Sequence, residues 1–334
     1  MSRKLDLASG GSLLLLAILL TLAGTAWRIA PLFLHPRVRL AGDGRTPESY
    51  GFDLSPLLVP RGQLVASGVA KDGLAALVNP RLMAASEVLV WNRGHRGKYL
   101  VPSDRIIGVR LDHEARAYPL RVLNWHEVVN DTLGGVPIAV TYNPLCDSVV
   151  VFHRTVGGEL LELGVSGLLY NSNLLMFDRR TGGRGESLWS QLQARAIAGR
   201  AAAEGRRLQS LPFSLARWDE WVARFGETTV LAPDPAEVER YSRDAYGTYF
   251  ESERLRFPVA PLPPEGMLPG KLRVLVVGPS GRRSVYRFED APERYRWPEQ
   301  GAGEIIHAFW FAWYATHPDD PGTLVESAAA TAGH

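Results

Sequence analysis

Residues 123–148 hold the side chains with the clearest catalytic potential. The only cysteine of the chain, Cys146, shares this stretch with His126, Glu127 and Asp131. A thiol attacks as its thiolate, which an imidazole base favours, and a carboxylate can orient that imidazole. One interpretation makes Cys146 a nucleophile and His126 its acid/base partner, with Glu127 or Asp131 orienting the ring. The structural alternative is a buried, unreactive thiol in a tight loop.

The same residue types also permit a metal site. Cys146, His126 and His153 offer thiolate and imidazole ligands, and Met176 adds a thioether. Such a set suits copper, whereas a carboxylate such as Glu127 shifts the preference to zinc. No pair among these residues has the spacing of a known metal motif, and His153 falls on a strand face where a core histidine is common. Copper or zinc is therefore an open alternative.

A second polar stretch, residues 166–191, has the composition of a binding site. Its hydroxyl, amide and carboxylate groups can hydrogen-bond a small polar molecule, and Arg179 can contact an anion. The alternative is that these residues form turns and caps. The candidate ligand-binding residues in and near this stretch are Asn130, Ser166, Tyr170, Asn173, Asp178, Arg179 and Thr181.

Strands and helices must position these groups. Apolar residues alternate over 136–142 and 149–153, which predicts a hairpin with residues 143–147 at its tip. A second hairpin is predicted over 105–120, and a short helix over 218–225.

One further helix is predicted over 122–129, and it would bring four polar residues together. The spacing of this segment is helical, and the side chains expected to converge at its end are His126, Glu127, Asn130 and Asp131. Residues 188–197 are expected to be helical as well. A polar cleft formed by segments 123–131, 143–148 and 166–181 follows from this arrangement.

Composition narrows the class of protein. The 334 residues are 46% hydrophobic and 22% charged, with a formal net charge of +2, which is typical of a globular chain. Because the charge is balanced and no Lys/Arg run occurs, nucleic acid is not an expected partner. The 33 Gly and 23 Pro imply many turns. We therefore expect a strand-rich α+β fold.

The N-terminal segment has the pattern of a membrane anchor. No charge occurs between Asp6 and Arg28, a run about as long as the roughly 20 residues that cross a bilayer. Arg3 and Lys4 precede the run, which predicts a cytoplasmic N-terminus and an exported domain. The alternative is a signal peptide that is cleaved near Thr25, where small residues occur.

A partial internal repeat is also predicted. Residues 273–288 repeat the pattern of residues 105–120, and Trp310 and Trp313 have the spacing of an earlier pair of tryptophans. Both pairs are expected to pack in the core. The predicted organisation is an anchor (1–34), a linker (35–63), a larger subdomain with the site (64–256), a smaller repeat-like subdomain (257–318) and a disordered tail (319–334).

The segments ARAYPL, HEVVND, TYNPLCDS, VSGLLYNSNLLMFDRRT and SLWSQ resemble the DUF3179 family of uncharacterised bacterial and archaeal proteins. The resemblance implies an exported or membrane-attached domain, with no established reaction. Where this chain has Asn143-Pro144-Leu145-Cys146, many relatives have a sequence similar to Cys-Pro-Leu followed by Cys or Thr. Because Cys146 is the only cysteine of this chain, the loop cannot form an internal disulfide or act as a dithiol here. The family's motif residues fall on Arg116, Tyr118, Pro119, His126, Glu127, Asn130, Asp131, Pro144, Ser166, Gly167, Asp178, Thr181, Ser187, Trp189 and Gln191.

The leading functional interpretation is a membrane-anchored, extracytoplasmic protein that binds or acts on a small polar ligand. His126 would be its acid/base group and Arg179 its anion contact. One alternative is an exported copper- or zinc-binding protein that uses Cys146 and histidines. Another is a non-catalytic partner in envelope assembly, which would require exposed tryptophans.

Overall fold

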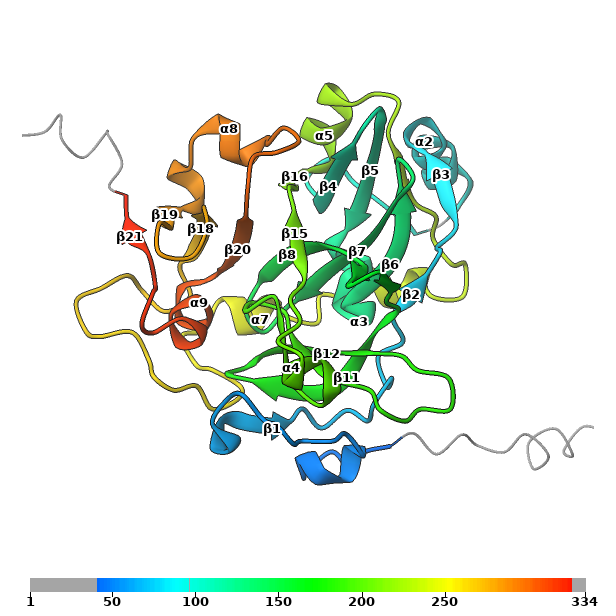
Figure 1. Cartoon of the computed structure of the whole chain (residues 1–334). Coiled ribbons are helices and arrows are strands. Elements are labelled where there is room, and N and C mark those ends of the chain that lie inside the picture. Colours follow the sequence, from blue (N-terminus) through cyan, green and yellow to red (C-terminus); the bar gives the residue numbers. More distant parts are fainter. Residues whose placement is uncertain (1–40, 96, 326–334) are drawn as a thin grey trace, which may run out of the picture. The chain divides into compact units, whose positions relative to one another are not determined.

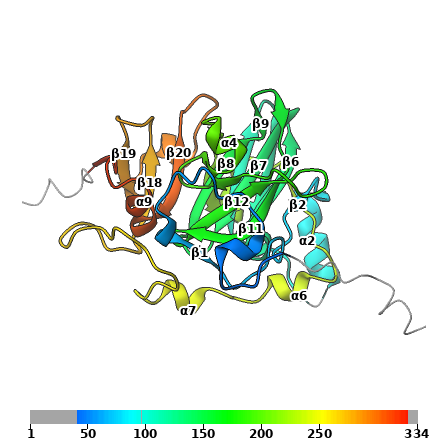
Figure 2. The same ribbon diagram turned by 60° about the horizontal axis from the view of Figure 1, so that its bottom comes forward.

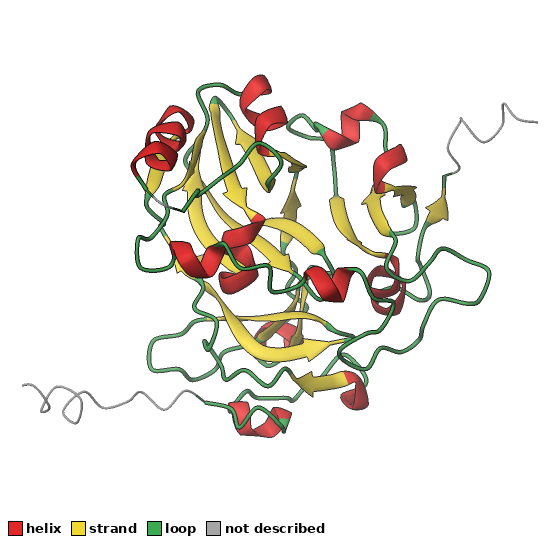
Figure 3. Cartoon of the chain, turned by 180° about the vertical axis from the view of Figure 1, so that it is seen from behind, coloured by secondary structure: helices red, strands yellow, loops and turns green. Residues whose placement is uncertain are grey.

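Strands form most of the regular structure, and the predicted strand-rich α+β class is confirmed (Figure 1, Figure 3). The computed structural model describes residues 41–95 and 97–325. The predicted anchor at 1–34, the first part of the predicted linker and residues 326–334 of the predicted tail lie outside these residues. None of the described helices is both long and apolar enough to cross a membrane.

The largest sheet has nine strands in the order β2-β6-β7-β8-β20-β18-β19-β21, and its β15 pairs with β8. Strand β8 belongs to the predicted larger subdomain and β20 to the predicted smaller one. Because these two strands are neighbours, both predicted subdomains contribute to this sheet. The bounds are β2 (Leu77–Val78), β6 (Val128–Leu133), β7 (Val136–Asn143), β8 (Ser148–His153), β15 (Gln209–Leu211), β18 (Arg273–Val277), β19 (Ser284–Arg287), β20 (Ile305–Phe309) and β21 (Thr323–Leu324).

Two five-stranded sheets accompany it, in the orders β16-β4-β5-β17-β3 and β1-β11-β12-β13-β14. The first contains β3 (Leu82–Ala84), β4 (Arg105–Leu111), β5 (Glu114–Pro119), β16 (Ser214–Arg217) and β17 (Thr229–Leu231). The second contains β1 (Leu64–Ala66), β11 (Leu163–Tyr170), β12 (Asn173–Asp178), β13 (Leu188–Ser190) and β14 (Arg195–Ala198). A small ribbon pairs β9 (Thr155–Val156) with β10 (Glu159–Leu160).

Strands β6 to β8 lie between these two sheets (Figure 1). Val140 and Val151 pack in one hydrophobic cluster with residues of β4 and β5, whereas Ala139 and Phe152 pack in another with residues of β11 and β12. Successive side chains of a strand point to opposite faces. Both faces of β7 and β8 are therefore buried, which explains why the sequences of these two strands are mainly apolar.

The helices are short and lie around the sheets (Figure 3). Helix α5 confirms the helix predicted over residues 218–225. The connection that contains α6 and α7 passes β11 (Figure 2). The helices are α2 (Ala85–Gly94), α3 (Leu120–His126), α4 (Arg200–Ala203), α5 (Trp218–Arg224), α6 (Val238–Tyr241), α7 (Gly247–Phe250), α8 (Glu293–Arg296) and α9 (Trp310–Thr316). Three short 3₁₀ helices are η1 (Pro47–Tyr50), η2 (Arg61–Gln63) and η3 (Phe288–Asp290).

Both predicted hairpins are confirmed, the helix predicted over 122–129 is confirmed only as far as His126, and the helix predicted over 188–197 is wrong. Helix α3 ends at His126, and β6 begins at Val128 and pairs with β7, so Asn130 and Asp131 lie on a strand. Residues 188–197 form parts of β13 and β14, because β13 pairs with β12. In both cases pairing with a neighbouring strand overrides the local helical pattern.

Two groups of four strands share one topology. In β16-β4-β5-β17 and in β20-β18-β19-β21, the successive pairings are antiparallel, antiparallel and parallel. Strand β16 leads into α5, and β20 leads into α9. The register places Arg105 and Arg273 at equivalent positions, since they pair with the last residues of β16 and β20. The core packing predicted for the tryptophans is confirmed, because all four are buried: Trp218, Trp221, Trp310 and Trp313.

Candidate functional site

A sharp backbone turn at Glu127 separates α3 from β6. Glu127 has φ +54° and ψ −31°, in the left-handed half of conformational space that residues with a Cβ atom rarely adopt. Consecutive side chains consequently line different cavities. His126 borders a cavity of about 420 Å³, and Glu127 borders one of about 210 Å³, hereafter the Glu127 cavity.

Glu127 is 6% exposed, and among the described residues its carboxyl group has one hydrogen-bonding side chain, Asn143, whose Nδ2 donates to Oε1 at 3.2 Å. Burial raises the pKa of this carboxyl from 4.5 to about 8, against the opposing effect of the Asn143 hydrogen bond. The protonated form therefore dominates at pH 7. Cys146 and Tyr246 also face Glu127, and burial raises the pKa of both of these groups.

Three segments singled out in the sequence meet at the Glu127 cavity. Glu127 comes from the first, Leu145 from the hairpin tip, and Leu168 and Leu174 from the third. Valine and leucine side chains form most of the wall, so this cavity is more apolar than the predicted cleft. The polar side chains that line it are Ser67, Glu127, Tyr246 and Arg256.

Gly167 allows a loop to close one side of this cavity. Its φ is +78°, and a Cβ atom added to it would lie 2.4 Å from the Val69 carbonyl oxygen. The Ser67 hydroxyl donates to the Gly167 carbonyl oxygen at 2.8 Å. Because a side chain at Gly167 would displace the backbone of the loop, glycine at this motif position shapes the cavity.

Cys146 and His126 are each engaged with other groups. The Cys146 side chain is fully buried and donates to the Ser172 carbonyl oxygen at 3.3 Å, and burial keeps the pKa of its thiol above the usual range. The Nδ1 atom of His126 bonds the Ala75 carbonyl oxygen at 2.7 Å, and its Nε2 atom bonds the Tyr241 hydroxyl at 2.8 Å. Neither group is placed to activate the other.

The candidate metal ligands do not come together either. His153 lies at the far end of the β7–β8 hairpin, opposite Ile138, roughly 17 Å along the strand from the tip that carries Cys146. Its Nδ1 atom accepts a hydrogen bond from the Thr155 amide at 3.0 Å. Across residues 41–95 and 97–325, no group of three or more His, Cys, Asp and Glu side chains is placed to hold a metal ion.

Two candidate residues on β6 connect the sheets. Asn130 exchanges two hydrogen bonds of 2.8 Å with the backbone of Leu163 in β11. Asp131 accepts hydrogen bonds from Arg116 at 2.7 Å and from the Tyr118 hydroxyl at 2.8 Å. The polar groups of both side chains are therefore satisfied within the fold.

Several other candidates also have partners within the protein. The Ser166 hydroxyl accepts a hydrogen bond from the Leu168 amide at 3.0 Å, at an irregularity in β11. Asn173 donates to Gln191 at 2.9 Å, and Arg179 forms two hydrogen bonds of 2.7 and 2.9 Å to the Asp72 carboxylate. Tyr170 borders a third cavity, and Thr181 is exposed in a turn.

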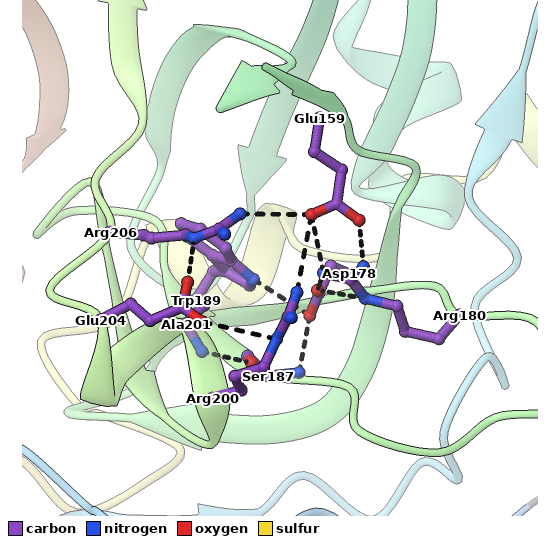
Figure 4. A network of polar contacts seen from close by, with 9 residues as sticks. All are labelled: Glu159, Asp178, Arg180, Ser187, Trp189, Arg200, Ala201, Glu204 and Arg206. Atoms are coloured by element: carbon purple, nitrogen blue, oxygen red, sulfur yellow. Dashed lines mark hydrogen bonds and ion pairs between the residues drawn. The ribbon is translucent and has the colours of Figure 1, made fainter. Parts of the chain in front are cut away.

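Asp178 organises a separate polar network (Figure 4). Its Oδ1 atom accepts hydrogen bonds from the Ser187 amide at 2.6 Å and the Trp189 indole at 3.2 Å. Its Oδ2 atom pairs with Arg180, which also pairs with Glu159. Asp178, Ser187 and Trp189, which are all motif positions, therefore hold β12 to the segment that enters β13.

Asp147, which is fully buried at the hairpin tip, is not among the site residues predicted from the sequence. Arg105 donates to both of its carboxylate oxygens at 3.1 Å, Arg273 donates at 2.5 Å, and the Tyr142 hydroxyl donates at 2.8 Å. Burial alone would raise the pKa of the Asp147 carboxyl, but the neighbouring positive charges, Arg105 foremost, hold it below its usual value. The signal in the sequence was an arginine at the start of both predicted repeats.

Fold and site together define a strand-rich α+β protein with a buried carboxylic acid at the wall of an apolar cavity. The family described as a protein of unknown function, DUF3179, matches residues 71–304, and the chain belongs to this family. Neither the curated proteins nor the solved structures contain a match to the chain.

Proposed function

We propose that this protein binds a small, largely apolar organic molecule in the Glu127 cavity and that Glu127 is the acid/base group toward it. The observation that carries the proposal is the buried Glu127 carboxyl at the cavity wall, on a residue with left-handed backbone. Strained backbone and buried ionisable groups are concentrated at functional sites.

The size and polarity of the cavity narrow the ligand class. An apolar cavity of about 150 Å³ holds a benzene molecule. At about 210 Å³, the Glu127 cavity suits a molecule with one ring or a short branched chain. Its Val and Leu wall favours an apolar body, and Glu127 can orient one polar group of the ligand. The proposed ligand is therefore polar at one end only.

Glu127 is suited to proton transfer near neutral pH. A general acid or base works best when its pKa is close to the working pH, and burial brings the pKa of Glu127 to about 8. At pH 7 the carboxyl group donates a hydrogen bond to an oxygen of the ligand. Proton transfer to that oxygen leaves the carboxylate, which Asn143 stabilises through its amide.

Benzyl alcohol is a suitable probe, because it combines a ring with one hydroxyl group. With the full-length chain, we expect it to shift the methyl NMR signals of the leucines and valines that line the cavity. Leu74→Trp should abolish these shifts by filling the cavity from a loop. The matched control is Leu160→Trp, at a leucine that is 59% exposed on β10. Unchanged cavity signals up to the solubility limit of the probe would contradict the proposal.

We further propose that residues 1–34 anchor the chain in the cytoplasmic membrane and that the cavity lies outside the cytoplasm. The support is the uncharged run after Arg3 and Lys4. Alkaline phosphatase, which folds only after export, should be active when it is fused to the C-terminus of the full chain. An inactive but intact fusion would argue against this location.

The two other interpretations have no specific observation in their favour. The residues suggested for copper or zinc, Cys146, His126 and His153, do not form one site among the described residues. The tryptophans suggested as a surface for an envelope partner are buried. We therefore propose neither.

A further inference from the structure

Arg256 gives the Glu127 cavity a positive charge at its border. This exposed residue lines the cavity together with Glu127, and in the part of the chain that the structure describes it forms no ion pair with an acidic side chain. Glu127 itself is mainly protonated at pH 7. Arg256 is thus the main charged group that a ligand meets in this cavity.

Two aromatic rings hold the Arg256 guanidinium group. Its central carbon lies 5.1 Å from the centre of the Tyr246 ring and 4.9 Å from the centre of the Tyr249 ring. Tyr249 is buried, and its hydroxyl donates to the Leu145 carbonyl oxygen at 2.8 Å. Because Leu145 also lines the cavity, this contact connects the aromatic support of Arg256 to the cavity wall.

Lys271 fixes the segment that leads to Arg256. Its ammonium group donates to the carbonyl oxygens of Tyr249 at 2.5 Å and Arg254 at 3.0 Å, and to that of Ser252. The backbone between α7 and Arg256 is thereby held in place. Arginine is suited to this position, because its planar guanidinium group stacks on rings while it binds a carboxylate through two hydrogen bonds.

We infer that the ligand is a small organic anion, a monocarboxylate with an apolar body. Its carboxylate pairs with Arg256 and accepts the hydrogen bond that the protonated Glu127 carboxyl donates, and its apolar body lies against the Val and Leu wall. This inference rests on the proposed function, since it names the class of molecule that the same cavity accepts. It replaces the Arg179 anion contact expected from the sequence, because Arg179 is paired with Asp72.

Three probes of similar size and different charge test the inference: benzoate, benzyl alcohol and benzylamine. Their dissociation constants are measured on the full-length chain from the methyl NMR signals of the cavity. We expect benzoate to bind about tenfold more tightly than benzyl alcohol, which corresponds to one charge-assisted contact at a partly solvated site. Benzylamine should bind most weakly.

Substitutions of Arg256 test whether this residue causes the preference for benzoate. Arg256→Gln should remove the advantage of benzoate over benzyl alcohol, and Arg256→Lys should keep part of it. The matched control, Arg254→Gln, changes a neighbouring exposed arginine that does not line the cavity and should have no effect.

The outcomes separate the two proposals. Equal affinity for benzoate and benzyl alcohol, or a benzoate preference that survives Arg256→Gln, would overturn the inference of an anionic ligand and leave the proposed cavity function standing. If none of the three probes shifts the cavity signals, both the cavity function and the ligand class fail.

Discussion

Glu127→Gln should make the protein more stable at alkaline pH, by on the order of 4 to 5 kcal/mol above pH 8. In the wild-type chain, the pKa of Glu127 is about 8 when folded, against 4.5 as its ordinary value. Between these two values the folded state keeps a proton that the unfolded state has released. The free energy of unfolding therefore falls as the pH rises through this range, by about 1.4 kcal/mol per pH unit.

Glutamine resembles the protonated carboxylic acid and does not ionise. The variant should thus match the wild type near pH 4 and diverge from it as the pH rises to 8. Urea unfolding at a series of pH values measures the difference. Glu265→Gln, at an exposed position, is the matched control and should follow the wild-type profile. Parallel profiles for Glu127→Gln and the wild type would show that Glu127 ionises normally in the folded state.

Such a gain in stability would also have a functional meaning. A residue that destabilises the folded state is retained where it serves binding or catalysis. For Glu127, the cost is the burial of an ionisable group with Asn143 as its hydrogen-bonding side chain. The same substitution should therefore stabilise the fold and remove the acid/base group of the cavity.

The second large effect concerns the hairpin tip. Asp147→Asn should lower the free energy of unfolding by about 3 kcal/mol, because removal of one partner leaves buried charges uncompensated. This expected loss of stability is at the lower end of the range for a broken buried ion pair. The reason is that the side chains of Arg105 and Arg273 are 33% and 40% exposed and keep part of their hydration. Urea unfolding at neutral pH measures this change.

Asp112→Asn is the matched control for this substitution. Asp112 also has a positive φ, of +53° against +40° for Asp147, but its side chain is 70% exposed in a turn. Because asparagine tolerates left-handed backbone, the control isolates the loss of the buried charge. Equal midpoints for Asp147→Asn and Asp112→Asn would contradict a structural role for the two arginines.

Elements with strictly local patterns were predictable from the sequence. The β7–β8 hairpin follows from apolar alternation on both sides of a short polar tip, and α5 follows from its amphipathic spacing. The helix over 122–129 was predicted to extend three residues too far, because its apolar spacing continues across Glu127, whose left-handed backbone ends α3. The local sequence pattern does not predict that Val128 pairs with Thr141.

The predicted polar cleft is only partly reflected in the structure. The three chosen segments do line one cavity, but most of their polar side chains bond each other or groups that are distant in the sequence. Arg179, for example, pairs with Asp72, which lies 107 positions away in the sequence. Such partners depend on sheet order, which residue types alone do not reveal. Arg256 was missed for the same reason, since it reaches the cavity from a distant loop.

The ionisation of Glu127 can be measured directly. In the full-length chain labelled with ¹³C at the glutamate carboxyl carbons, the signal that disappears in Glu127→Gln belongs to Glu127. We expect this signal to titrate with a midpoint near 8, and we expect benzoate to raise the midpoint, because a bound anion disfavours a second negative charge. A midpoint near 4.5 that benzoate leaves unchanged would show that no protonated acid faces the ligand cavity.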